Sequence, residues 1–176
     1  MYSREAPKEP AITIGLMTAA DVDAVHEIEV ASFRTPWSKE SFLHDVEENQ
    51  CARYMVVRED GKAIAYAGVW FILDEGHITN IAVHPDRRGM GYGEMVTRAM
   101  IQLAADSGMN WMTLEVRRSN KAAQALYHKL RFIDVGYRKR YYENSEDALI
   151  MALEHLPEGN PENDPMLVVE DDGTDG

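Results

Sequence analysis

A glycine-rich segment in the middle of the chain has the residue types and spacing of an anion-binding site. It reads Arg88-Gly-Met-Gly-Tyr-Gly-Glu94 and lies between an apolar stretch that ends at Val83 and a helical pattern that continues to Leu103. Glycines let the backbone approach a ligand closely, and the first N–H groups of a helix have no intrahelical acceptor. A phosphate group is therefore the expected ligand. The segment lacks the Lys-Ser/Thr ending of a P-loop, and its GxGxG spacing differs from the GxGxxG of dinucleotide-binding loops.

A second segment, residues 114–127, carries two side chains that can exchange protons. Glu115 lies in a stretch with strand-like alternation, which places it on the opposite face from its apolar neighbours. From the residue types alone, pairing of Glu115 with an arginine is the simpler explanation. Tyr127 fits an ordinary core position on an amphipathic helix, and Ser119 or Asn120 fits the N-cap of that helix.

Both segments require a sheet with helices beside it. Strand patterns cover 12–17, 52–59, 63–72, 78–83, 111–116, 132–137 and 148–153. Helical patterns cover 18–33, with inner positions at Val22, Val25, Ile28 and Ala31, a stretch capped by Ser38, the stretch after the glycines, and 120–130. Asp60-Gly61 predicts a hairpin turn. We therefore expect an α/β (α+β mixed) fold, with a central mixed, mostly antiparallel sheet of about 6–7 strands flanked by about 4 helices.

The composition predicts one globular domain with loose ends. We expect residues 1–10 to form a loose lead-in, 11–156 the domain, and 157–176 an acidic, flexible tail. The single cysteine excludes an internal disulfide framework, and the chain has neither a signal-like segment nor an apolar run of membrane-spanning length. A cytoplasmic protein without membrane contact is expected.

The charge and the histidines limit the partners. A formal net charge of -12 argues against direct nucleic-acid binding and favours a basic peptide or amine as partner. The six histidines show no metal-ligand spacing, so no metal is predicted. The acidic residues expected to help attract a basic acceptor are Asp45, Glu47, Glu48 and Glu143.

The combined motifs resemble those of the GNAT N-acetyltransferases. Arg88-x-x-Gly91-x-Gly93 is similar to the pyrophosphate-binding motif of this superfamily. The segments NIAVHPD, LEVRRSN, ALY and EDALIMAL, together with Pro36-Trp37-Ser38, are similar to the RimI type, the acetyltransferases of the N-terminal alanine of ribosomal protein S18. The resemblance covers about residues 12–154 and implies a GNAT fold, acetyl-CoA as co-substrate, and direct attack of an amine on the thioester.

The resemblance also assigns roles to individual residues. Glu115 would be the base and Tyr127 the acid that protonates the departing sulfur. A backbone N–H of the strand end would polarise the acetyl carbonyl. Trp37, Tyr141 and Tyr142, which otherwise fit packing aromatics, would border the acceptor groove. The implied cofactor-binding residues are Ile81, Ala82, Val83, Arg88, Gly89, Met90, Gly91, Tyr92, Gly93, Glu94 and Asn120.

Several acceptors remain open within this class. A protein N-terminus, with S18 as first choice, competes with a small amine, a lysine or other protein N-termini, and the sequence does not determine the oligomeric state. A non-catalytic acyl-CoA-binding module is the alternative from another class, but such a module needs neither Glu115 nor Tyr127. One position departs from the family: Arg131 stands where a glycine usually ends the helix, and an arginine in the left-handed conformation would cost roughly 1 kcal/mol.

Overall fold

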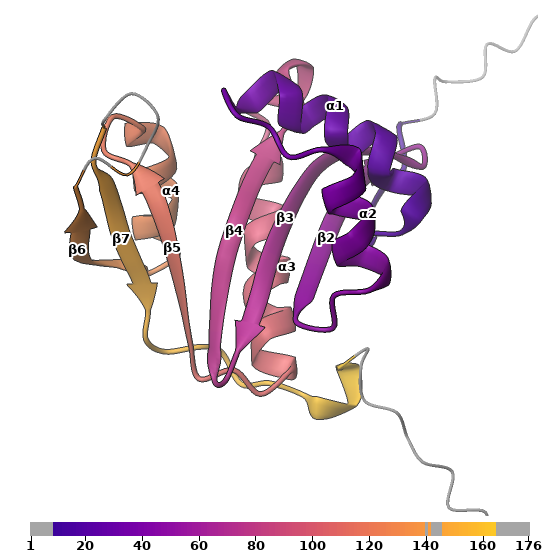
Figure 1. Ribbon diagram of the computed structural model, residues 1–176. Coiled ribbons are helices and arrows are strands. Elements are labelled where there is room, and N and C mark those ends of the chain that lie inside the picture. The colour runs from indigo at the N-terminus through magenta and orange to yellow at the C-terminus, as the bar shows by residue number, and fades with distance from the viewer. Residues whose placement is uncertain (1–8, 140, 142–145, 165–176) are drawn as a thin grey trace, which may run out of the picture. The chain divides into compact units, whose positions relative to one another are not determined.

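The computed structural model describes residues 9–139, 141 and 146–164. Seven strands form one sheet in the order β1-β2-β3-β4-β5-β7-β6, with both parallel and antiparallel pairs, and the described chain has four α-helices (Figure 1). The predicted mixed sheet flanked by helices is thereby confirmed. The chain divides into two compact units, Met1–Val69 with Asn80–Thr97, and Trp70–Thr79 with Arg98–Gly176. Each unit is described by itself below.

The first unit contains the first two helices and the strands β1 and β2, and β3 begins in it. β1 pairs antiparallel with β2, and the turn after β2 has positive φ at both Asp60 and Gly61, as two-residue hairpin turns require. Phe42 contacts the rings of Tyr54 and Tyr66 edge to face, at centroid distances of 5.9 and 5.8 Å, and the three rings form the centre of the core. The elements that begin in this unit are β1 (Ile12–Leu16), α1 (Val22–Ser32), α2 (Lys39–Glu47), β2 (Ala52–Glu59), β3 (Lys62–Ile72) and α3 (Tyr92–Asp106).

The inner face of α1 differs from the prediction at one position. Val22, Val25 and Ile28 are buried as expected, whereas Ala31 is exposed and Glu29 is buried in its place. A helix has 3.6 residues per turn, so Glu29, seven residues after Val22, returns to the same face. The sequence pattern passed over Glu29 because a carboxylate is rarely buried without partners.

The second unit contains the C-terminal strands and α4. β5 pairs antiparallel with β7, which pairs in turn with the edge strand β6. β5 also pairs in parallel with β4 over four residue pairs, from Glu75 opposite Trp111 to Ile78 opposite Leu114. The bounds are β4 (Glu75–Val83), β5 (Trp111–Arg117), α4 (Lys121–Lys129), β6 (Ile133–Arg138) and β7 (Ala148–Leu153).

Arg131, two residues after the end of helix α4, has the left-handed conformation, with φ of 74°. The N–H of Arg131 donates to the carbonyl of His128, and the N–H of Phe132 donates to the carbonyl of Tyr127, each at 2.9 Å. The rings of Tyr127 and Phe132 lie 6.0 Å apart. These two bonds and the accompanying apolar contact define a Schellman motif. Arg131 therefore adopts the strained left-handed conformation at the position where a glycine usually stands, which the sequence alone left open.

Part of the segment assigned to the flexible tail is held against α3. The N–H of Asn160 donates to Asp106 Oδ1 at 2.8 Å, and Gln102 Nε2 donates to the carbonyl of Glu158 at 3.2 Å. A Cβ atom on Gly159 would collide with the carbonyl of Ala105, so a side chain there requires movement of the backbone. Residues 165–176 of the expected tail lie outside the described residues.

Candidate active site

The glycine segment, all in the first unit, leads directly into the start of α3. Gly89 and Gly91 have positive φ of 76° and 88°, and a Cβ added to either would meet no atom within 4 Å. The first helical bond runs from the N–H of Met95 to the carbonyl of Gly91, at 3.0 Å. The N–H groups of residues 92–94 therefore have no acceptor within the helix. Open space beside two glycines and a helix N-terminus fits a pyrophosphate.

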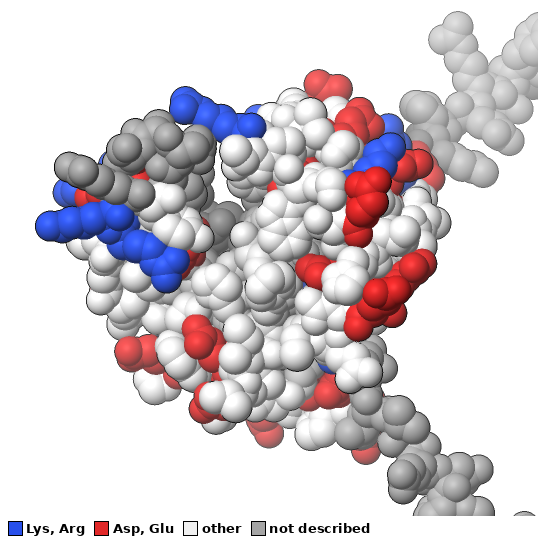
Figure 2. All heavy atoms as spheres, viewed as in Figure 1, with Lys and Arg blue, Asp and Glu red and all other residues white. Residues whose placement is uncertain are grey.

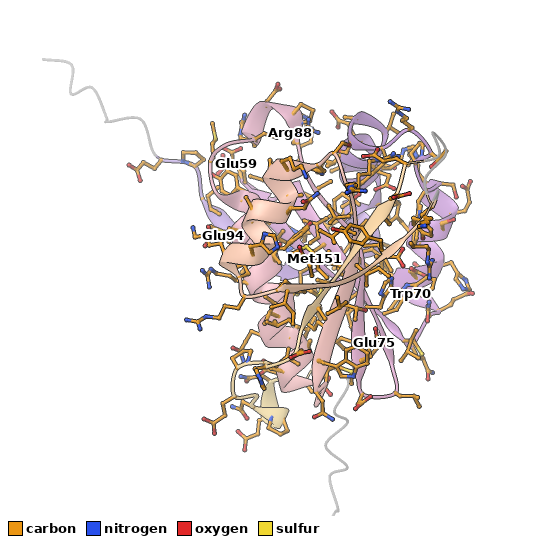
Figure 3. The ribbon with its side chains drawn as sticks, turned by 90° about the vertical axis from the view of Figure 1, so that its left-hand side faces the viewer. Glu59, Trp70, Glu75, Arg88, Glu94 and Met151 are labelled. Carbon is orange, nitrogen blue, oxygen red and sulfur yellow. The ribbon has the colours of Figure 1, made fainter. Side chains whose placement is uncertain are left out.

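Two arginines hold this segment in place. Arg88 donates from Nε to the carbonyl of Val83 at 3.0 Å and from Nη2 to Ser32 Oγ at 3.1 Å. Arg87 pairs with Glu59, its Nε lying 2.7 Å from the carboxylate. Glu59 and Arg88 are labelled in Figure 3. The structure thus shows Arg88 tying the loop to β4 and α1. A direct contact between Arg88 and phosphate stays a prediction.

The end of β4 leads into the glycine segment. Burial alternates along the strand, with Ala82 buried and Ile81 and Val83 partly exposed. Among the described residues, the ladder with β5 includes no residue of β4 after Ile78. The N–H of His84 donates to the carbonyl of Ile64 at 2.8 Å, which secures the strand end to β3.

Glu115 lies on β5, in the second unit, with two polar partners. Its side chain is 14% exposed, and its Oε1 lies 3.3 Å from Arg138 Nη1. Tyr141 shares a hydrogen bond with the carboxylate, and the Arg138 guanidinium stacks over the Tyr141 ring at 4.8 Å. Partial burial and this carboxylate raise the pKa of Tyr141. The pairing with an arginine that residue types favoured is confirmed, whereas a role of Glu115 as a base stays a prediction.

Tyr127 and Asn120 occupy structural positions as well as candidate ones. Tyr127 is buried, with its ring against Phe132, and Asn120 caps α4 by accepting the N–H of Ala123 on its Oδ1 at 3.2 Å. Proton donation by Tyr127 and cofactor binding by Asn120 stay predictions.

The predicted acceptor residues are distributed over both units. Trp37 precedes α2, and its ring lies 5.8 Å from that of Phe42. Tyr141 belongs to the group around Glu115. Tyr142 lies outside the described residues.

The expected acidic surface needs one correction. Asp45 is 5% exposed and accepts hydrogen bonds from Tyr54 Oη at 2.8 Å and Asn49 Nδ2 at 3.1 Å, so it supports the core and does not face an acceptor. Glu143 lies outside the described residues. Acidic side chains do gather over α1 and α2 on the face drawn in Figure 2. The exposed carboxylates of these helices and their ends are Asp23, Glu27, Glu40, Glu47 and Glu48.

Sequence reasoning missed three residues that organise the site. Arg138 pairs with Glu115, Glu29 is buried among polar groups, and Glu146 accepts the N–H of Ser119 at 2.7 Å. For Glu29, the spacing of seven residues from Val22 indicates a position on the inner face of the helix. The partners of the other two are set by strand pairing, which a local pattern does not contain.

The described part of the chain contains neither a membrane-spanning helix nor a cluster of metal-ligating side chains. None of its helices combines the length and the apolar character needed to cross a bilayer. The same residues contain no group of three or more His, Cys, Asp or Glu side chains arranged to hold a metal ion.

Residues 22–132 match the model of the acetyltransferase (GNAT) family, and the chain belongs to this family. It is 45% identical over 136 residues, 77% of this chain and 90% of the relative, to a Bacillus subtilis (strain 168) protein named "Putative [ribosomal protein bS18]-alanine N-acetyltransferase". It is 37% identical over 146 residues to the [ribosomal protein bS18]-alanine N-acetyltransferase of Escherichia coli (strain K12), covering 80% of this chain and 96% of the relative.

A solved structure agrees with these sequence matches. The crystal structure of the ribosomal-protein-S18-alanine N-acetyltransferase from Escherichia coli superposes with a TM-score of 0.76 at 33% identity, covering 86% of this chain and 98% of that one. The resemblance to RimI-type acetyltransferases is confirmed by these relatives.

Proposed function

We propose that this protein transfers acetyl from acetyl-CoA to the α-amine of a protein N-terminus, and that ribosomal protein S18 is the acceptor. The observation that carries the proposal is the 37% identity to the Escherichia coli S18-alanine acetyltransferase over 96% of that enzyme's length. Fold alone would not support an acceptor, since acetyltransferases of one fold act on different amines. The similarity extends along nearly the whole relative, which supports a shared acceptor.

The glycine segment is the proposed site of the pyrophosphate of acetyl-CoA. The open space beside Gly89 and Gly91 and the N–H groups at the start of α3 support this placement. Glu94 lies in the first turn of α3, where its carboxylate would repel a phosphate, so it would contribute through its backbone N–H. The backbone of residues 81–83 would pair with the pantetheine arm.

Bound acetyl-CoA supplies a thioester whose acyl carbon an amine can attack. Much of an α-amine with pKa of ~7.7–8.0 is charged at neutral pH. Glu115 would take a proton from this amine, directly or through water, so that the nitrogen lone pair can form the new amide bond. A backbone N–H of residues 81–83 would stabilise the charge on the carbonyl oxygen. As the carbon–sulfur bond breaks, Tyr127 would give its proton to the sulfur. The second proton that the nitrogen loses would restore the Tyr127 hydroxyl through solvent, and the proton on Glu115 would return to solvent.

The charge of the first unit favours a cationic acceptor. The exposed carboxylates on α1 and α2 would attract a peptide with basic residues after its first, and salt would weaken this attraction. Lys39 partly offsets them, since its Nζ lies 3.1 Å from Asp23 Oδ1. Trp37, Tyr141 and Tyr142 are the proposed contacts to the peptide.

The test is turnover with matched acceptors. The protein is incubated with acetyl-CoA and either a basic peptide that begins with alanine, the same peptide with its α-amine blocked, or a free polyamine. We expect acetylation of the free peptide only. Comparable turnover of the blocked peptide would favour a lysine acceptor, and preference for the polyamine would favour a small-amine enzyme. Binding of acetyl-CoA without turnover of any amine would favour a non-catalytic module.

A further inference from the structure

A buried carboxylate that the proposed chemistry does not use connects three parts of the first unit. Glu29 of α1 is 2% exposed. Its Oε1 accepts the backbone N–H of Trp37 at 3.1 Å, and its Oε2 accepts Asn80 Nδ2 at 3.3 Å and the hydroxyl of Tyr66. A buried carboxylate without such donors would cost several kcal/mol, so the three donors explain how it is tolerated.

The same residue holds both ends of the connection between α1 and α2. The N–H of Phe33 donates to the backbone carbonyl of Glu29 at 3.0 Å, and the N–H of Trp37 donates to the Glu29 side chain. Residues 33–36, which lie between these two bonds, include exposed side chains and belong to no helix or strand. The connection is therefore a short loop closed at both ends on one residue.

The other two donors come from β3 and from β4, the strand that ends in the proposed cofactor residues 81–83. Tyr66 lies on β3 and is fully buried, and Asn80 lies on β4 directly before Ile81. Burial and the Glu29 carboxylate both raise the pKa of Tyr66 far above its usual value, so its hydroxyl remains a donor throughout the physiological range. Glu29 thus joins the loop at Trp37 to the part of β4 proposed to polarise the acetyl carbonyl.

We infer that Glu29 is a positioning residue that fixes the loop 33–37 relative to the end of β4 and thereby places the acceptor peptide. This inference rests on the proposed function, in which Trp37 borders the acceptor. The charge itself is required. An apolar side chain would fill the volume, but it would remove the acceptor that the Trp37 N–H, the Tyr66 hydroxyl and the Asn80 amide share.

The variant Glu29→Gln tests this role with little change in shape. A carboxamide has a single oxygen, so it can accept from the Trp37 side or from the Tyr66 and Asn80 side, while its NH₂ group faces the remaining donors. We expect the Michaelis constant for an alanine-starting peptide to rise ~10-fold, with kcat within ~2-fold and acetyl-CoA affinity unchanged. Hydrogen exchange of the Trp37 amide should accelerate by at least ~10-fold.

A matched control is available in the same unit. Asp45 is also buried and also accepts a tyrosine hydroxyl, yet its side-chain partners, Tyr54 and Asn49, lie outside the loop. Asp45→Asn should lower the melting temperature without changing the Michaelis constant for the peptide. Tyr66→Phe removes a donor of Glu29 but preserves the bond to Trp37, so it should behave like Asp45→Asn.

The outcomes separate this inference from the proposed function. Failure of the wild-type protein to acetylate the peptide would contradict the proposed function. An active wild type whose Glu29→Gln variant shows the same peptide Michaelis constant as Asp45→Asn would overturn the positioning role. If the Glu29→Gln variant does not fold, amide hydrogen exchange of the wild-type protein provides the test. A Trp37 amide that exchanges as fast as the Thr35 amide would also overturn the positioning role of Glu29.

Discussion

Arg138 Nη1 lies 3.3 Å from Glu115 Oε1, and the same guanidinium covers the ring of Tyr141, which is hydrogen-bonded to that carboxylate. The arginine side chain is 55% exposed, so the pair interacts through solvent-screened charges and contributes at most about 1 kcal/mol. The free protein thus holds the Glu115 carboxylate between Arg138 and Tyr141, and the proposed base would have to exchange these partners for an incoming ammonium group.

Glu115→Gln separates a base from a salt-bridge partner. The amide keeps the shape and cannot accept the proton, so we expect kcat to fall ~100-fold or more with near-normal acetyl-CoA binding. Steady-state kinetics and calorimetry measure the two effects. Glu146→Gln is the control, because Glu146 also pairs with an arginine, at 3.3 Å from Arg117, but has no proposed proton role. Equal turnover of Glu115→Gln and wild type from about pH 6 to pH 9 would remove Glu115 from the mechanism.

Gly91→Glu tests the pyrophosphate site. The new side chain would occupy the open space beside the glycine and carry a negative charge towards the phosphates, so acetyl-CoA affinity should fall by at least ~100-fold. Gly61→Glu is a matched control. Gly61 has a similar φ of 85° and similar open space, so the backbone strain is the same while cofactor binding should be unchanged. Unchanged calorimetric affinity in a folded Gly91→Glu protein would exclude this site.

Arg131→Gly tests the strained helix end. Glycine adopts positive φ without a steric cost, so we expect the free energy of unfolding to rise by about 1 kcal/mol and the melting temperature by ~2–4 °C. Lys129→Gly, at the last residue of α4, should instead lower stability by about 1 kcal/mol. Thermal unfolding of the two variants measures both changes in stability. A destabilised Arg131→Gly protein would show that contacts of the arginine side chain stabilise the fold by more than the backbone strain costs.

Asp21→Asn tests the ion pair that anchors the start of α1. Burial raises the pKa of Asp21. Hydrogen bonds from Arg58, at 2.9 and 2.6 Å, and from the Thr18 N–H lower it by more, so the pKa lies below its usual 3.8. A lowered pKa stabilises the fold above the unfolded-state value and loses this effect as the pH falls through the folded-state value. The variant should therefore be less stable by ~2 kcal/mol at neutral pH, with the difference vanishing in acid.

The control for this pH dependence is Asp23→Asn. The Asp23 side chain is 86% exposed, and its pairing with Lys39 should contribute little. Denaturant unfolding at several pH values measures both variants. A stability difference for Asp21→Asn that is constant down to strongly acidic pH would contradict the assignment to the charged carboxylate.

Local signals predicted most of the fold because each acts over a few residues. Ser38 caps α2 by accepting the N–H of Ser41, and Asp60-Gly61 forms the expected turn. Each of these two features depends on backbone geometry that the residue itself prefers. Arg131 differs, because the sequence showed only that it stands where a glycine usually ends the helix, and the structure shows its left-handed conformation.

The polar organisation of the site could not be predicted in this way. Glu29 bonds to Tyr66 and Asn80, which are 37 and 51 residues away in the sequence. Asp45 appeared to be a surface charge until the fold placed Tyr54 against it. Arg138 reaches Glu115 because β7 brings β5 and β6 to either side of itself. Partners of this kind are set by strand order, and no periodicity in the sequence encodes them.

The most direct test of the proposed activity uses one peptide with two competing amines. The peptide begins with alanine, continues with basic residues, and contains a single internal lysine. After incubation with acetyl-CoA, fragment-resolved mass spectrometry locates the acetyl group. We expect it on the alanine α-amine, because this amine titrates ~2–3 pH units below a lysine side chain and is more readily deprotonated by Glu115. Acetylation of the lysine with the α-amine left free would contradict the account.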